Sequence, residues 1–399
     1  MAVLTPMDPR FHAIVLGLSP TGLYVARELG RAGGRLLGVD LGPAPATASR
    51  YFSGGQTWQA AADGALVDRL LAYASGTGTR PLLVPTSDVF IELVMRHAAR
   101  LRQAFEFAPC YDGLAEDLLD KQRFHALCAR HGVETPGIWQ APDKAALAAL
   151  APSIPYPCIL KPVLIHRAKD FLKGHKVLVA RTREEYAAYV DSIPAESGAW
   201  FVQEIIPGPE SAITLFATYV DRGGDVRQGF TARKLRQYPS GFGSASLVIS
   251  HDCEETREIS TRFLQAIGFR GVCGVEFKRD PRDGRLKIIE INPRPTLWFQ
   301  LSHAAGKRVV ESAARDLLGL PSLPDLPQRQ GVQWRYLLKD WASAAFYRRQ
   351  GAAFLFPAPD LSAGGPVTAR CWPVFDAADP MPALVEPFHF LRKALRRLA

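Results

Sequence analysis

Two carboxylates and an amide have the spacing of a cation site. Glu276 lies in the apolar segment GVCGVEF, and Glu290 and Asn292 lie in IIEIN, beyond the turn-forming sequence DPRDG. The turn predicts a hairpin, and alternating side chains on its two strands bring residues 276 and 290 onto one face. Because carboxylate and amide oxygens suit Mg²⁺, we predict a magnesium site here rather than an ordinary charged strand face. Arg294, two residues beyond Asn292, would add paired donors for a phosphate or carboxylate.

Lysines gather in a segment that suits a polyphosphate. Lys161 follows the apolar run Cys-Ile-Leu, where a cation needs a partner, and a polar, basic loop comes after it. Lys121 opens a predicted helix, a position at which a lysine alone carries little information. The alternative interpretation is that this segment is an ordinary surface loop whose lysines are exposed to solvent. The predicted phosphate-binding cations are Lys121, Lys161, Lys169 and Lys176.

An extended segment between these lysines and the hairpin is suited to a purine. It consists of Gln203, Glu204, Ile205 and Ile206 and runs into a Pro-Gly turn. An extended edge offers backbone groups to a base, and Glu210, just beyond the turn, is placed to reach ribose hydroxyls. The position of the segment between the lysine strand and the carboxylate hairpin carries this prediction, since the segment alone is a weak signal.

The first hundred residues alternate strand and helix, which is typical of a parallel, doubly wound sheet. The predicted elements are strands at 12–18, 35–40 and 81–85 and a helix at 22–32. The turn LGLSPTG, with Asp40 further on, resembles a dinucleotide fingerprint, but its middle glycine is absent and Pro20 interrupts it, so NAD binding is disfavoured. Thr86, Ser87 and Asp88 follow the third strand at its carboxyl end, where such sheets bind ligands, and are predicted to contact the substrate.

Four regions are predicted along the chain, and the fold class is α/β and α+β. The parallel-sheet domain is followed by a small lobe, a large lobe with antiparallel strands and the hairpin, and a basic, aromatic C-terminal extension. The helical part of the extension either packs on the protein body, which we favour, or lies on an anionic membrane surface. The predicted bounds are 1–115, 116–200, 201–325 and 326–399.

The composition is that of an ordinary globular enzyme, with 399 residues, 47% hydrophobic and 22% charged. A net charge of +9 would suit nucleic acid, but the basic residues are spread through predicted helices and no nucleic-acid-binding motif occurs. No secretory signal and no membrane-spanning apolar run is found, so we predict a cytoplasmic protein, with the inner membrane face as a peripheral alternative. The six scattered cysteines are interpreted as buried side chains rather than metal ligands or disulfides.

Five motifs, in order, resemble those of the ATP-grasp superfamily. They are Asp120-Lys121, Ile-Leu-Lys161-Pro, Val-Gln-Glu204-Ile-Ile-Pro-Gly, Val-Glu276-Phe and Ile-Glu290-Ile-Asn292-Pro-Arg294. The resemblance implies a two-lobed ATP-grasp fold after the parallel-sheet domain. The contacts that it implies are Lys121 and Lys161 with the ATP phosphates, Glu204 and Ile206 with adenine, Glu210 with ribose, and Glu276, Glu290 and Asn292 with one or two Mg²⁺ or Mn²⁺ ions.

A further segment is similar to the ATP-grasp ligases of the D-aspartate ligase type, which join carboxylates to amines. It is TARKLRQYPSGFGSA at 231–245, and in that subgroup the strand bearing Lys234 and Arg236 faces the triphosphate and the acyl-phosphate site. Many ATP-grasp enzymes close the site with a glycine-rich loop. Here residues 165–174 keep a single glycine among cations, so cationic side chains are predicted to cover the γ-phosphate.

These features together predict an enzyme that uses ATP and Mg²⁺ to activate a carboxylate as an acyl phosphate and to pass it to an amine. Lys161, Lys234, Arg236 and Arg294 would neutralise the charge of the transferring group. The alternatives are carboxylation with bicarbonate and a nucleotide-binding regulatory or assembly protein without turnover. The predicted partners are a small carboxylate and an amine rather than nucleic acid, and the resemblance is compatible with a homodimer.

Overall fold

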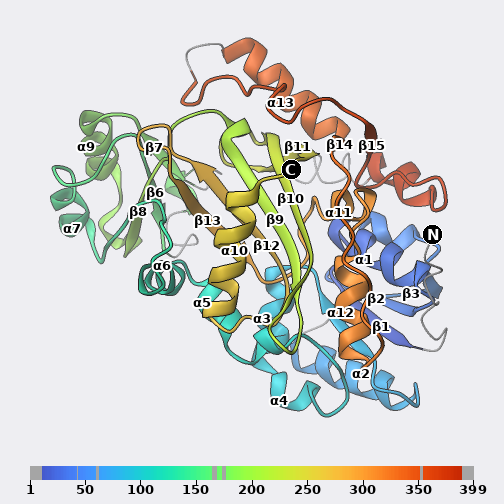
Figure 1. The fold of residues 1–399 in the computed structure, drawn as a ribbon. Helices are drawn as coiled ribbons and strands as arrows, with labels where there is room; N and C mark the ends of the chain where they lie inside the picture. The colour runs from blue at the N-terminus through green and yellow to red at the C-terminus, as the bar shows by residue number, and fades with distance from the viewer. Residues whose placement is uncertain are drawn as a thin grey trace.

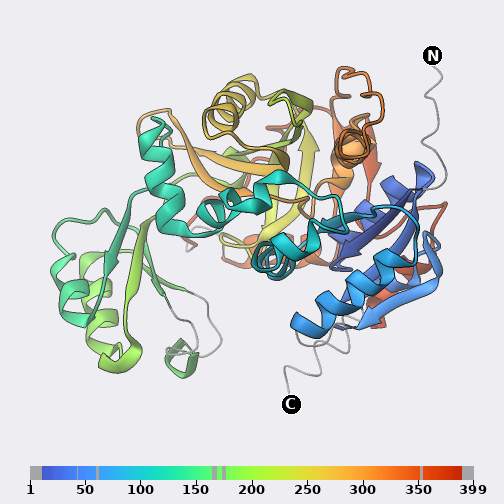
Figure 2. The ribbon, with the colours of Figure 1, turned by 90° about the horizontal axis from the view of Figure 1, so that it is seen from below.

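Three sheets organise the part of the chain that the structure describes. The computed structural model describes residues 11–42, 44–59, 63–163, 169–172, 177–350 and 354–388. The large sheet lies between the N-terminal sheet and a small sheet (Figure 1), and the small sheet with its helices projects from the rest of the molecule (Figure 2). One sheet is parallel and the others are mainly antiparallel, which confirms the predicted fold class.

The N-terminal domain is a parallel sheet of order β3-β2-β1-β4 with helices on both faces. Its elements are β1 (His12–Leu16), α1 (Pro20–Arg31), β2 (Arg35–Asp40), β3 (Phe52–Gln59), α2 (Asp63–Ser75), β4 (Leu82–Pro85), α3 (Asp88–Arg96), α4 (Ala98–Leu101) and α5 (Leu114–Leu119). Ala13 and Val15 pack with α1, whereas Ile14 and Leu16 pack with α2 and α3. The apolar run of β1 is therefore buried on both faces, as parallel sheets require.

The small lobe is an antiparallel sheet of order β5-β8-β6-β7. Its elements are α6 (Lys121–Arg130), β5 (Ile138–Ala141), α7 (Lys144–Ala149), β6 (Cys158–Pro162), α8 (Lys169–Leu172), β7 (Leu178–Ala180), α9 (Arg183–Ser192) and β8 (Trp200–Glu204). The prediction placed residues from 201 onward in the large lobe. The structure corrects this boundary, because β8 pairs with β5 and β6 and buries Trp200 and Val202 in the core of the small lobe.

The large lobe is a seven-stranded sheet of order β13-β12-β9-β10-β11-β14-β15. Its elements are β9 (Ile213–Val220), β10 (Val226–Tyr238), β11 (Ser244–Ser250), α10 (Glu254–Ala266), β12 (Gly271–Arg279), β13 (Leu286–Asn292), α11 (Gln300–Ala304), α12 (Val309–Leu317), β14 (Val332–Arg335) and β15 (Ala369–Cys371). Since β14 and β15 extend this sheet beyond β11, part of the predicted C-terminal extension belongs to the large lobe.

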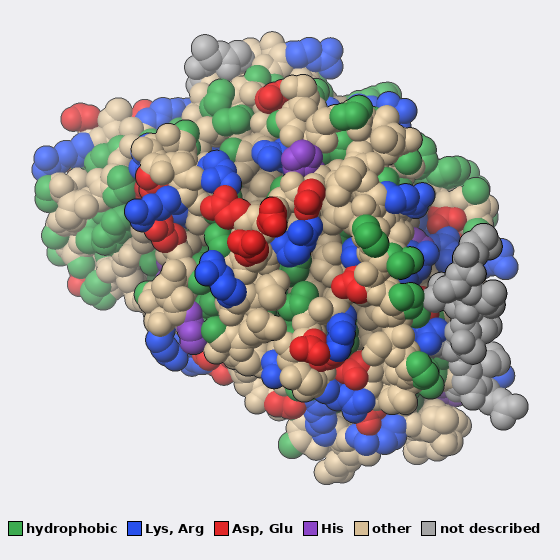
Figure 3. All heavy atoms as spheres, viewed as in Figure 1, with side chains coloured by type: hydrophobic (Ala, Val, Ile, Leu, Met, Phe, Trp, Pro, Cys, Tyr) green, Lys and Arg blue, Asp and Glu red, His purple; other side chains and the backbone are tan. Residues whose placement is uncertain are grey.

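The remaining C-terminal helix, α13 (Leu337–Gln350), lies across β10 and β11 at the top of Figure 1. Residues 389–399 of the predicted basic helix lie outside the described residues. In the described ranges, no helix is both long and apolar enough to cross a bilayer. On the face in Figure 3, lysine and arginine side chains are interspersed with acidic ones rather than gathered in one basic patch.

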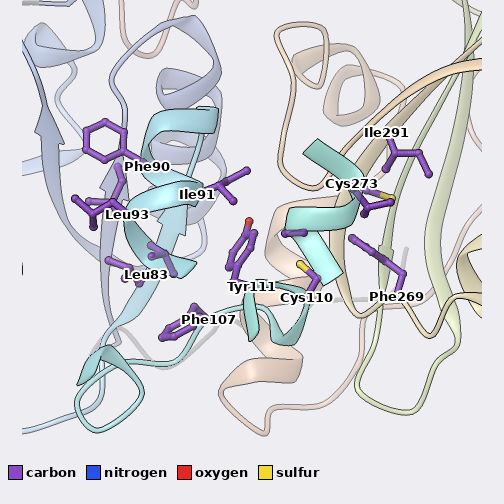
Figure 4. Packing of buried hydrophobic residues seen from close by; sticks show 14 of the residues in the cluster. Leu83, Phe90, Ile91, Leu93, Phe107, Cys110, Tyr111, Phe269, Cys273 and Ile291 are labelled. Carbon is purple, nitrogen blue, oxygen red and sulfur yellow. The ribbon is translucent and has the colours of Figure 1, made fainter. Parts of the chain in front are cut away.

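Buried side chains join the N-terminal domain to the large lobe next to β13. Tyr111 lies between Ile91 of α3 and a group from the large lobe that includes Cys273 and Ile291 (Figure 4). The Tyr111 hydroxyl donates a hydrogen bond of 2.9 Å to the carbonyl oxygen of Pro293. This contact fixes the end of β13, where the predicted cation ligands and Arg294 are found.

Candidate active site

Most of the predicted nucleotide and cation residues line one cleft between the small lobe and the large sheet, and Asn292 is not among its lining residues. Its volume is about 350 Å³, within the range of small-molecule sites. The predicted residues that line it are Lys121, Lys161, Gln203, Glu204, Ile205, Ile206, Glu210, Lys234, Glu276 and Glu290. A larger hollow of about 820 Å³ runs along α3 and α5, but it is open and lined by ion-paired charges such as Arg102 and Asp112.

The β12–β13 hairpin pairs Glu276 directly with Glu290, as the alternation of side chains predicts. The pairing shifts between Glu276 and Phe277, so Ile289 is an extra residue on β13 and both Ile289 and Glu290 line the cleft. The Asn292 amide donates a hydrogen bond of 2.9 Å to Glu290. Like charges directly opposite each other destabilise a sheet. A divalent cation between the two carboxylates would remove that cost.

The oxygens at this hairpin fit Mg²⁺. Burial raises the pKa of Glu276 and the carboxylate of Glu290 adds to this rise, whereas Lys234 opposes it. Lys234 is 3% exposed, and its ammonium lies 2.5 Å from Glu276 Oε2. Within the described ranges no three His, Cys, Asp or Glu side chains form a metal cluster. Two carboxylates with the Asn292 amide leave positions for phosphate oxygens and water, as Mg²⁺ requires.

Cations line the same cleft. The Lys121 ammonium lies 3.2 Å from Gln203 Oε1, at the base of the small lobe. Burial lowers the pKa of Lys121, the charge of Lys161 lowers it further, and Glu290 acts in the opposite direction. Lysines close enough to repel each other in a partly buried cleft are suited to binding a polyanion. A nucleotide triphosphate with its cation fits this combination of charges.

The Glu204 carboxylate in the β8 segment is hydrogen-bonded within the protein. Glu204 accepts a hydrogen bond of 2.8 Å from the Gly137 amide and forms an ion pair with Arg282. Its charge is therefore already compensated. The backbone amides of Glu204 and Ile205 also donate hydrogen bonds within the protein, so the predicted adenine contacts of this segment stay predictions. Ile205 and Ile206 are buried in the wall of the cleft.

Curated relatives match about half of the chain in sequence, although no protein-family model matches it. The chain is 28% identical over 224 residues to the D-aspartate ligase of Enterococcus faecium, a match that covers 53% of each protein. It is 26% identical over 231 residues to the carbamoyl phosphate synthase large chain of Halobacterium salinarum, covering 55% of this chain and 21% of the relative. The chain thus spans about half of the ligase and about a fifth of the synthase.

Solved structures with a similar fold cover more of the chain than the curated relatives do. An N5-carboxyaminoimidazole ribonucleotide synthetase in complex with ADP has a TM-score of 0.62 at 14% identity, covering 82% of this chain and 81% of its own. The biotin carboxylase domain of a Hydrogenobacter thermophilus 2-oxoglutarate carboxylase, solved with MgADP and bicarbonate, has a TM-score of 0.60 at 18% identity, covering 80% and 71%. The chain has the ATP-grasp fold, and its sequence is similar to that of an ATP-grasp ligase. At these identities the structures themselves show the ATP-grasp fold alone.

Two side chains for which the ATP-grasp resemblance implies ligand contacts form hydrogen bonds with other residues of the protein. Glu210 is buried and accepts hydrogen bonds from the backbone amides of Gln237 (2.9 Å) and Gly241 (2.6 Å), so it stabilises the β10–β11 turn. Its predicted contact with a ribose stays a prediction. Arg236 forms two hydrogen bonds with Asp340 of α13, at 2.6 and 2.8 Å, so its guanidinium holds the C-terminal helix.

The predicted substrate residues divide into two groups. The Nε of Arg294 lies 2.7 Å from Asp88 Oδ1, which brings the end of the ATP-grasp hairpin to the carboxyl edge of the N-terminal sheet. The Thr86 hydroxyl instead bonds to the carbonyl oxygens of Leu16 and Gly17 and is buried. Ser87 precedes α3 at its N-cap position. The Ser87 side chain forms no capping hydrogen bond with α3, so Ser87, Asp88 and Arg294 stay predicted substrate contacts.

Some predicted cations of the basic loop lie outside the described side chains. Lys176 and residues 164–168 are not among the described residues, and for Lys169 only the backbone is described, as the first residue of α8. The predicted cover of the γ-phosphate by cations of residues 165–174 stays a prediction, as do the predicted phosphate contacts of Lys169 and Lys176.

Lys278 is a cleft residue that the sequence reasoning missed. It lies on β12 two residues after Glu276, so the same alternation could have placed it on the cleft face. Its ammonium donates hydrogen bonds to the carbonyl oxygens of Ile206 (2.8 Å) and Gly208 (2.9 Å). Burial lowers the pKa of Lys278 to about 8, against the opposing effects of Glu210 and Asp280.

Replacing Lys278 with methionine is expected to change how stability depends on pH. The pKa of this lysine is about 8 in the folded chain against an ordinary value of 10.5, so between these pH values the unfolded chain binds a proton that the folded chain does not. The wild-type free energy of unfolding should therefore rise, relative to Lys278→Met, by about 2–3 kcal/mol from pH 7 to 10. Urea unfolding of both chains across this range measures the difference. Lys144→Met is the control, and a difference that does not vary with pH would contradict the buried lysine.

Proposed function

We propose that this protein is an ATP-dependent ligase that activates a carboxylate as an acyl phosphate and condenses it with an amine. The observation that carries the proposal is the direct pairing of Glu276 and Glu290 in a cleft that also holds Lys121, Lys161 and Lys234. The similarity to D-aspartate ligase supports an amine as the acceptor. The cleft supplies the parts that phosphoryl transfer needs, namely positioning and neutralisation of charge.

The residues of the chain have separate tasks in this proposal. Glu276, Glu290 and Asn292 would hold the cation, and Lys121 and Lys161 would bind phosphate oxygens. When bound, a divalent cation supplies charge neutralisation at the transferring phosphoryl group. Arg294 would orient the substrate carboxylate, since its planar guanidinium can bond both oxygens of a carboxylate.

The reaction balances as two displacements. An oxygen of the substrate carboxylate attacks the γ-phosphorus of ATP, and ADP leaves. The amine nitrogen then attacks the acyl carbon, inorganic phosphate leaves, and the nitrogen loses a proton. Lys234, buried beside Glu276, would stabilise the negative charge that builds up on the phosphate in both steps.

Bicarbonate is the second candidate for the activated carboxylate. Its support is the likeness in fold to the biotin carboxylase domain that was solved with MgADP and bicarbonate. A nucleotide-binding protein without turnover is the remaining alternative. A homodimer and a contact between the C-terminal basic residues and an anionic membrane stay predictions.

Release of ADP and phosphate from ATP and Mg²⁺ tests the proposal. Amino acids, small carboxylates and bicarbonate would be added singly and in pairs, and the products followed by mass spectrometry. We expect release only when a carboxylate and an amine are both present, with a product that has lost one water relative to the pair. Release with bicarbonate and an acceptor, giving a carboxylated product, would favour the carboxylase alternative. Binding of ATP without release in any combination would count against an enzyme of this class.

A further inference from the structure

The C-terminal segment is bound to the large lobe and contributes one side chain, Phe356, to the lining of the candidate cleft. We call residues 337–350 and 354–360 the C-terminal strap. Asp340 in α13 is fully buried, and it accepts hydrogen bonds from Arg236 and Arg335. Further along, the Asp360 amide donates a hydrogen bond of 3.0 Å to Ser211 Oγ. The strap is therefore anchored to the large lobe on both sides of the residues that reach the cleft.

Between these anchors, Phe356 forms part of the cleft wall. Its ring is 4% exposed and lies 5.6 Å, centroid to centroid, from the ring of Phe242 in the β10–β11 turn. Gly241 has a φ of +89°, and a Cβ atom there would lie 3.1 Å from a ring carbon of Phe356. The turn thus requires glycine both for its backbone conformation and for the close approach of the strap.

Phe356 also touches Lys278. The Lys278 ammonium lies 4.2 Å from the centroid of the Phe356 ring, a cation–π contact. Two of its three N–H groups are used on the Ile206 and Gly208 carbonyls. These two carbonyls do not use the third N–H group of the ammonium.

The position of this pair along β12 identifies which part of a nucleotide it would meet. Lys278 follows Glu276 by two residues, which places their Cα atoms about 7 Å apart along the strand. Glu276 and Glu290 mark the phosphate and cation end of the cleft. Lys278 instead bonds the Ile206 carbonyl, in the segment where a purine edge is expected. The apolar side chains of Ile206, Ile213 and Phe356 are gathered in the wall of the same cleft.

We propose that Phe356 and Lys278 contact the base of the bound nucleotide, so that the C-terminal strap completes the nucleotide site. This inference rests on the proposed nucleotide-dependent function. An aromatic face can stack on a purine, and the remaining N–H of Lys278 can donate to a ring nitrogen or a ribose oxygen. The strap would then supply an aromatic contact to the base in addition to the contacts from the small lobe and the large sheet.

Calorimetric titration with two probes tests the inference on the full chain. MgADP carries a base, and magnesium tripolyphosphate does not. Phe356→Ala should weaken MgADP binding by about tenfold, as expected for loss of one base–aromatic contact, and leave tripolyphosphate binding unchanged. Phe356→Leu keeps the bulk of the side chain and should weaken MgADP binding by a smaller factor. Phe375→Ala, an exposed phenylalanine of the same C-terminal region, is the control and should bind both probes as the wild type does.

The results separate this inference from the function on which it rests. If the wild type binds MgADP and both Phe356 variants bind it with the same affinity, the proposed base contact is wrong. The proposed function is not affected by that result. Equal weakening of both probes would also overturn it, because the ring would then act on the phosphate end of the cleft. If Phe356→Ala does not fold, Phe356→Leu decides. A wild-type chain that binds tripolyphosphate and MgADP equally well would show that no base contact exists.

Discussion

Replacing Glu290 with glutamine is expected to reduce ATP turnover by about 10³-fold while the chain stays folded. The substitution removes one of the two charges that face each other across the β12–β13 hairpin. Glutamine keeps the size of the side chain and an oxygen for the Asn292 amide, so the hairpin should not be disturbed. Relief of the repulsion with Glu276 should leave the stability of the cation-free chain equal or slightly higher. Steady-state release of ADP at saturating Mg²⁺, with thermal unfolding alongside, measures both effects.

The control for this variant is Glu258→Gln, which makes the same chemical change at an exposed position on α10. It should leave turnover and its Mg²⁺ dependence as in the wild type. Turnover in Glu290→Gln above about a tenth of the wild-type value, with the same Mg²⁺ dependence as the wild type, would contradict the assignment of Glu290 as a cation ligand. An intermediate loss that is restored by raising Mg²⁺ would place Glu290 in cation binding alone, without a role in the chemical step.

The pairing of Glu276 with Glu290 could be predicted because it depends only on sequence features within the hairpin itself. Side-chain alternation and a turn signal suffice to bring Glu276 and Glu290 together, and the observed register pairs them directly. Arg236 shows where this reasoning stops. On a regular strand it would share a face with Lys234, but the pairing of β10 with β11 shifts on either side of Arg236. The shift, and a partner 104 residues away in Asp340, direct Arg236 to α13 instead.

The small-lobe boundary and the strap depend on contacts between distant segments. The segment of β8 reads as a strand, but only its pairing with β5 and β6 shows to which sheet it belongs. Nothing near Phe356 in the sequence marks it as a cleft residue, since its neighbours in the wall, Phe242 and Lys278, are far along the chain. The prediction that Glu210 binds ribose rests on its position beyond the turn and on the ATP-grasp resemblance. The Glu210 carboxylate accepts hydrogen bonds from two backbone amides, one at the end of β10 and one in the β10–β11 turn. Such contacts between distant residues cannot be predicted from the spacing of residues in the sequence.

Truncating Asp379 to alanine is expected to destabilise the chain by about 3–5 kcal/mol, because it leaves a buried arginine charge without its partner. Arg27 of α1 is fully buried, and its Nε lies 3.0 Å from Asp379 Oδ2. The same carboxylate accepts hydrogen bonds from the Ser49 hydroxyl (2.8 Å) and the Arg50 amide (3.0 Å). One carboxylate thus joins the C-terminal residues to the N-terminal domain. Urea unfolding followed by circular dichroism measures the loss.

A second variant and a double-mutant cycle distinguish the buried charge from a general effect of truncation. Asp376→Ala removes the partner of Arg31 in a more exposed pair and should cost less than about 1 kcal/mol. Arg27→Met combined with Asp379→Leu removes both charges, so its cost should be well below the sum of the two single losses. Additive losses would mean that Arg27 and Asp379 act independently. A loss below about 1 kcal/mol for Asp379→Ala would mean that water or a neighbouring group compensates Arg27, and that the C-terminal residues are held to the N-terminal domain by their apolar contacts instead.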